Sequence, residues 1–156
     1  MKTEIFRLND QLKRSFDGEA WHGPALMELL NGVTVAMAVA HPMQNAHSIW
    51  EIVAHIAGWE GVILRRLAGE DVTEPAEGDF PAPPANASES DWQALISRAK
   101  EHHKRLTDAV ADLEEAKFHQ RVGDKPYHNW FMLHGAVSHV LYHAGQIAIL
   151  KKALGN

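Results

Sequence analysis

Apolar residues recur every three or four positions in four long stretches of the chain, and this spacing predicts amphipathic α-helices. The stretches cover residues 3–17, 48–68, 90–113 and 126–154. The last stretch is apolar around most of its circumference, which is typical of a helix buried on more than one side. No stretch of useful length alternates as a β-strand would, so the pattern predicts an all-α protein.

Signals at the ends of these stretches support the same interpretation. Ser48 with Glu51, and Ser90 with Gln93, each fit a capping box, in which a serine and a residue three positions later satisfy the first N–H groups of a helix. Pro24 fits the first position of a short extra helix after the first long one, over the sequence ALMELLNG.

The link between the second and third predicted helices is unusually long. Residues 70–90 contain four prolines, several acidic residues and little helical periodicity. About 20 extended residues can cross a helix that is about 30 Å long, so the third helix can run parallel to the second. We therefore expect one domain over residues 1–156, a four-helix bundle with a long crossover link.

Composition narrows the classes of function. A formal net charge of −5 argues against a nucleic-acid-binding surface, which needs a basic stripe. The chain has no cysteine, so any thiol chemistry requires a thiol from a cosubstrate. We find neither a secretory signal nor an apolar run of the roughly 20 residues that span a membrane. We expect a cytoplasmic protein with a small-molecule substrate and no nucleic-acid or membrane partner.

Three histidines on core-facing positions are candidate metal ligands. His139 and His143 lie four residues apart, so their imidazoles project one turn apart from one face of the last helix. About 0.8 such pairs are expected by chance among 11 histidines, but this face also carries apolar residues and points towards the core. His55 lies beside the apolar stripe of the second helix. Three imidazoles that leave a coordination position open are typical of a catalytic metal site, and the alternative is three separate, hydrogen-bonded core histidines.

Two stretches that contain these histidines resemble a known family. HSIWEIVAHIAGWE at residues 47–60 and HVLYHAGQI at residues 139–147 are similar to signature stretches of the DinB-like (YfiT-like) metalloenzyme superfamily, and AWHGPALMELLNGV near residue 20 is similar to its N-terminal part. The resemblance implies an up-down-down-up four-helix bundle with a divalent metal bound by His55, His139 and His143. It also implies relatives that are transferases or isomerases using thiols such as bacillithiol or mycothiol, and many that are dimers.

Several details stay open at this point. Imidazole suits Zn, Ni, Mn and Fe, so the sequence does not choose the metal. Gln146 follows His143 by three residues and is a candidate to support that ligand or to contact the substrate, with a packing role as the alternative. Ligation needs neutral imidazoles, so we expect metal affinity to fall below about pH 6. His102 and His103 lie beside the apolar stripe of the third predicted helix, and we expect them to contact solvent, with an approach of one of them to the pocket as the alternative. The five histidines at positions 41, 47, 119, 128 and 134 are expected in turns or at the surface.

Three functions are compatible with these patterns. The first is a metal-dependent enzyme that uses an external thiol, as the resemblance implies. The second is a binding module that holds a small ligand or a metal without turnover. The third is a helical dimerisation protein whose histidines only pack. The wide apolar surface of the last helix predicts a homodimer in any of these cases.

Overall fold

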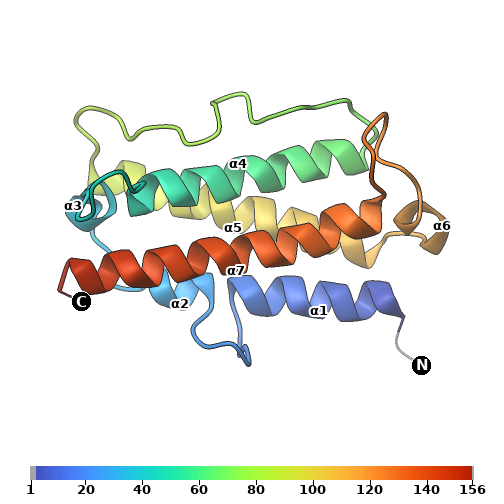
Figure 1. Ribbon diagram of the computed structural model, residues 1–156, viewed down its shortest axis with the longest axis horizontal. Coiled ribbons are helices and arrows are strands. Elements are labelled where there is room, and N and C mark those ends of the chain that lie inside the picture. The colour runs from blue at the N-terminus through green and yellow to red at the C-terminus, as the bar shows by residue number, and fades with distance from the viewer. Residues whose placement is uncertain (1–2, 156) are drawn as a thin grey trace.

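A computed structural model describes residues 3–155, and over this range the protein is all-helical. Figure 1 shows four long helices lying alongside one another, and they are α1 (Glu4–Phe16), α4 (Ile49–Leu67), α5 (Glu89–Ala111) and α7 (Asn129–Ala153). The described residues contain no β-strand, only an isolated bridge between Arg121 and His128. The expected all-α class is confirmed.

The four long helices pack around two clusters of buried apolar side chains. α4 packs against α5 and α7, and α1 packs against the same two helices. In Figure 1, α1 and α7 run in one direction, whereas α4 and α5 run in the other. Three short helices, α2 (Leu26–Leu30), α3 (Val35–Ala38) and α6 (Glu115–Phe118), lie in the connections. No helix in the described part of the chain is long and apolar enough to cross a bilayer.

Side-chain caps determine where the two central helices begin. Ser48 accepts from the Glu51 N–H at 3.2 Å, and the Glu51 carboxylate accepts from the Ser48 N–H at 2.7 Å, which is the predicted capping box of α4. The prediction for α5 was wrong by two residues, because the cap is formed by Ser88 and Asp91. The Asp91 carboxylate accepts from both the N–H and the hydroxyl of Ser88, at 2.8 and 2.6 Å. A charged carboxylate also interacts favourably with the positive end of the helix dipole, and an amide does so less.

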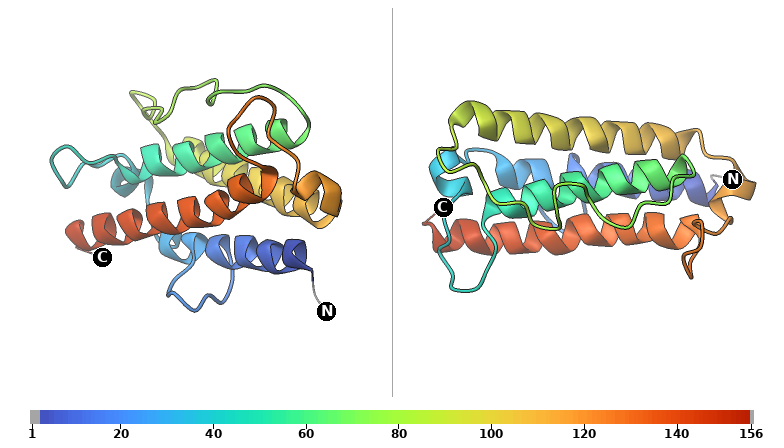
Figure 2. Two further views of the ribbon diagram at one scale, coloured as in Figure 1. Left: turned by 45° about the vertical axis from the view of Figure 1, so that its right-hand side comes forward. Right: turned by 90° about the horizontal axis from the view of Figure 1, so that it is seen from above.

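The link between α4 and α5 has no helix and lies along the outside of α4 (Figure 2). Arg66 of α4 fixes its first part by donating to the carbonyl oxygens of Val72 and Thr73, at 2.8 and 2.9 Å. Trp59 fixes its middle by donating from Nε1 to the Asp79 carboxylate at 2.7 Å. The link is therefore an anchored segment that covers one face of α4.

Candidate metal centre

Three histidines from two helices meet in the interior between α4 and α7. His55 of α4 and His139 of α7 place their Nε2 atoms 2.7 Å apart. His143 lies one turn further along α7, and its ring centroid is 4.6 Å from that of either other histidine. One nitrogen from each of the three rings lies within 4.8 Å of the others. His55 and His143 are buried and His139 is half-buried, so the group reaches solvent on the side of His139.

Oxygen acceptors orient two of the three rings. The Nδ1–H of His55 donates to the backbone carbonyl of Asp79 at 2.7 Å, and the Asp79 carboxylate lies 3.0 Å from the same nitrogen. The Nδ1–H of His143 donates to Oε1 of Gln146, also at 2.7 Å. Because each neutral ring carries its proton on Nδ1, its Nε2 keeps a free lone pair. Gln146 thus supports one member of the triad of His55, His139 and His143, which is one of the three roles considered for it from the sequence.

Two residues of the link, Asp79 and Phe80, are neighbours of the triad that the sequence pattern did not indicate. The Phe80 ring stacks on His55 with a centroid distance of 3.9 Å and an interplanar angle of 5°. His47 stacks on the other side of Phe80 at 3.7 Å, and it is exposed, as expected from the sequence. The link has no periodicity from which the positions of Asp79 and Phe80 could be inferred.

The environment favours the neutral form of all three imidazoles. Burial lowers the pKa of His139 to about 4, and the positive charges that His143 and His55 would carry add to this effect. Burial also lowers the pKa of His55, although the hydrogen bonds and charge of Asp79 oppose it. The pKa of His143 is lowered by burial, against the raising effect of its hydrogen bond to Gln146. Neutral imidazole is the form that binds a metal ion.

Two further histidines, both on α5, contact residues of α4. His103 is buried, and its Nδ1 lies 2.8 Å from the Glu60 carboxylate of α4. His102 is half-buried, and its Nδ1–H donates to the Ala57 carbonyl at 2.7 Å. The expected contact with solvent is wrong for His103, because Glu60 of α4 holds its ring in the interior, whereas half-buried His102 keeps some contact with solvent. Neither belongs to the triad.

The donor set of the triad fits a divalent metal ion. Three imidazole nitrogens from a buried site form a ligand set suited to Zn²⁺ and to several other first-row metals. Two of the rings already present Nε2 lone pairs, and an oxygen acceptor fixes the remaining nitrogen of each, as is usual for metal-binding histidines. Within the described residues, this is the one group of three or more histidine or carboxylate side chains close enough to share an ion.

Comparison with known proteins gives one match. The family model of the DinB superfamily matches residues 20–147, a range that includes the three histidines and every stretch that carried the resemblance. No curated protein and no solved structure matched the chain. Because the family model covers most of the sequence, the chain belongs to the DinB superfamily.

Proposed function

We propose that this protein is a metal-dependent enzyme whose divalent cation is held by His55, His139 and His143. The convergence of three imidazoles from two helices carries the proposal, together with acceptors that fix two of the rings. The proposal includes one domain over residues 1–156 with an up-down-down-up bundle. It also includes a cytoplasmic setting, where low-molecular-weight thiols stay reduced.

The proposed reaction is a transfer or isomerisation of a small molecule with an external thiol as cosubstrate. A divalent cation bound by three imidazoles supplies Lewis acidity and lowers the pKa of a coordinated thiol or water. The chain has no cysteine, so a thiol in this site would come from a cosubstrate. The half-buried His139 marks the side from which the cosubstrate would enter.

Residues around the triad orient it and limit its contact with water. The Asp79 carbonyl and Gln146 Oε1 hold the two Nδ1–H groups, so the rings of His55 and His143 do not rotate freely. The Asp79 carboxylate, itself held by Trp59 Nε1–H, places a negative charge 3.0 Å from His55 Nδ1 and increases the basicity of that ring. The Phe80 ring covers the face of His55 on which it stacks and excludes water there.

Replacing His143 by Ala tests the ligand assignment. We expect wild-type protein to bind about one equivalent of Zn²⁺ or Ni²⁺ per chain, and His143→Ala to lose this binding because one of three nitrogen donors is removed. His134→Ala is the matched control, since His134 is an exposed histidine of the same helix whose contact is with Glu4. Metal content measured by mass spectrometry decides the test. A folded His143→Ala variant with wild-type metal content would refute the assignment.

Turnover separates the enzyme from a binding module that holds a ligand without reaction. Metal-loaded wild-type protein should consume thiols such as bacillithiol or mycothiol when it is screened against electrophiles, and His143→Ala should not. Metal binding without turnover of any thiol would favour the binding module. A protein that binds no metal would favour the dimerisation protein, in which the histidines only pack.

A further inference from the structure

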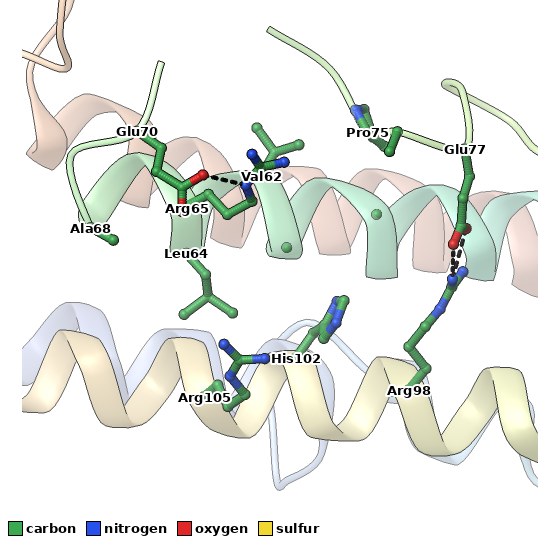
Figure 3. Close-up of a pocket in the computed structure, with 13 residues that line it drawn as sticks. Val62, Leu64, Arg65, Ala68, Glu70, Pro75, Glu77, Arg98, His102 and Arg105 are labelled. Carbon is green, nitrogen blue, oxygen red and sulfur yellow. Dashed lines mark hydrogen bonds and ion pairs between the residues drawn. The ribbon is translucent and has the colours of Figure 1, made fainter. Parts of the chain in front are cut away.

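A cleft of about 360 Å³, separate from the histidine triad, lies between α4 and α5 (Figure 3). Positions 58, 61, 62 and 65 of α4 line it, at the spacing of one helix face. Positions 98, 102 and 105 of α5 line it from below, again on one face. The link closes the cleft with Pro75 and with two acidic residues, Glu70 and Glu77.

Two glycines of α4 keep this cleft open. A Cβ added at Gly58 would lie 3.1 Å from the ring carbons of Pro75, and one added at Gly61 would lie 3.1 Å from the His102 ring. Both distances are shorter than ordinary van der Waals contacts. The missing side chains therefore let the link and the α5 side chains approach α4 without filling the space between them.

The cleft concentrates positive charge on an acidic protein. Three of the seven arginines in the chain line it, Arg65, Arg98 and Arg105, although the net charge of the whole chain is −5. Two carboxylates, those of Glu70 and Glu77, also line it, so the formal charge of the lining is three minus two, or +1, before His102 is counted. Arg105 forms no ion pair with any residue that the structure describes.

The acidic residues of the link occupy only part of the arginine donors. Both oxygens of Glu77 accept from one nitrogen of Arg98, Nη1, at 2.6 and 2.7 Å. The Nε of Arg98 is buried and has no hydrogen-bond partner. A buried donor without a partner has lost its hydration, so an acceptor that reached this N–H would satisfy it.

The ion pairs that now close the cleft are weak. Arg65 and Glu70 are joined at 2.7 Å but are 53% and 50% exposed, and Glu77 is 56% exposed. Exposed pairs of this kind contribute little to stability, because water screens the two charges. Figure 3 shows the Arg65–Glu70 pair at one end of the cleft and the Arg98–Glu77 pair at the other, with His102 between them.

We propose that this cleft binds the phosphate group of a small soluble phosphate ester. A phosphate dianion offers more acceptor oxygens and more charge than the single carboxylate that each link residue provides, and guanidinium groups match its geometry. It would engage the free donors of Arg98 and Arg105 and displace Glu77 from Nη1. The proposal does not depend on the function proposed for the histidine triad.

Titration calorimetry with inorganic phosphate and with glycerol phosphate, at constant ionic strength and neutral pH, tests the proposal. We expect Arg98→Gln and Arg105→Gln each to weaken binding by about tenfold or more, because each removes a charge-assisted hydrogen bond. Glu77→Gln should strengthen binding, because it removes the competing carboxylate. Arg7→Gln, which changes an exposed arginine of α1, is the control and should leave binding unchanged.

Opposite signs for Arg98→Gln and Glu77→Gln distinguish a specific site from general charge attraction, since a folding defect would not strengthen binding. Circular dichroism and retained metal binding at the triad would show that the variants fold. Absence of binding at millimolar phosphate, or equal weakening by Arg7→Gln, would overturn the proposal. Cosedimentation with vesicles that contain phosphatidate, without binding of glycerol phosphate, would also overturn it in favour of a lipid headgroup.

Discussion

His139 differs from the other two triad histidines in how its proton is placed. The Nε2 of His55 carries a lone pair, because its Nδ1–H donates to Asp79, and it lies 2.7 Å from the Nε2 of His139. A hydrogen bond between the two Nε2 atoms therefore has His139 as its donor. As a ligand in the proposed metal site, His139 would instead have to present a nitrogen lone pair, either at Nδ1 or, with its proton on Nδ1, at Nε2.

The lowered pKa values predict that metal binding persists to lower pH than ordinary histidines would allow. The pKa of His139 is lowered to about 4, and those of His55 and His143 lie below their ordinary value of 6.5, so the three rings stay neutral to lower pH than free histidines do. We therefore expect the loss of affinity below about pH 6, in the range down to the His139 pKa near 4. Metal content after equilibrium dialysis across this range measures the effect. Substantial metal loss already at about pH 6 would contradict the prediction.

The same lowered pKa values determine how the stability of the metal-free protein changes with pH. The unfolded chain takes up protons near the ordinary histidine pKa of 6.5, whereas folded His139 takes one up only near 4. Between these values the unfolded state binds more protons, so the free energy of unfolding falls as the pH is lowered from about 6.5 towards about 4. A melting temperature of apo protein that stays constant over this range would argue against the buried, neutral triad.

The triad itself was predictable from the sequence, but its surroundings were not. The spacing of His139 and His143 and the place of His55 beside an apolar stripe put all three on core-facing surfaces, and the family resemblance joined them into one group. Asp79 and Phe80 lie in the link, where no periodicity relates a residue to a helix face. Their positions follow from contacts with Trp59 and His55 of α4. Such contacts between distant parts of the chain cannot be inferred from the sequence of the link alone.

At the scale of elements, the long periodic helices were predicted well, and so was the short helix α2, which Pro24 and the sequence ALMELLNG indicated, whereas α6 was not predicted. The four long helices follow from their apolar stripes, and α1 and α4 begin and end within about one residue of the prediction. The four-residue helix α6 is too short for any periodicity to appear. The start of α5 was misplaced because both Ser88 and Ser90 lie in capping patterns, and only the contact geometry distinguishes them.

The pair of Glu60 and His103 predicts a large effect on stability. Both side chains are buried between α4 and α5, at 2% and 8% exposure, and each has a second polar atom without a partner. Glu60→Ala would leave the His103 Nδ1–H unsatisfied and create a cavity, so we expect the free energy of unfolding to fall by about 3–5 kcal/mol. Urea unfolding measures this loss. Glu101→Ala, at an exposed position of α5, is the control and should change stability by less than about 0.5 kcal/mol.

At the scale of the whole molecule, the link between α4 and α5 connects two regions of different chemistry. Its Glu70 and Glu77 reach into the arginine-lined cleft, and Asp79 and Phe80 contact His55 of the triad. Only one residue separates Glu77 from Asp79. In the proposed phosphate complex, the displaced Glu77 would lie two positions before Asp79, whose backbone carbonyl accepts from His55 Nδ1–H.

The outer face of α7 predicts a homodimer. Positions 131, 135, 138, 142, 145 and 149 are all exposed and follow one another at alternating intervals of four and three residues, the repeat by which two helices pack along a shared seam. Phe131, Tyr142 and Ile149 are 55%, 66% and 56% exposed, and the glycines at positions 135 and 145 leave room for a partner helix to approach closely.

Replacing Tyr142 by Glu tests this surface. A charge at the middle of an apolar seam lacks a partner after desolvation, so Tyr142→Glu should be monomeric where wild-type protein is dimeric. Tyr142→Phe keeps the ring and should stay dimeric, and Met43→Glu places the same charge on an exposed apolar side chain outside α7. Sedimentation velocity measures the mass of each variant. A monomeric wild-type protein, or a dimer that survives Tyr142→Glu, would show that this face of α7 does not form the seam.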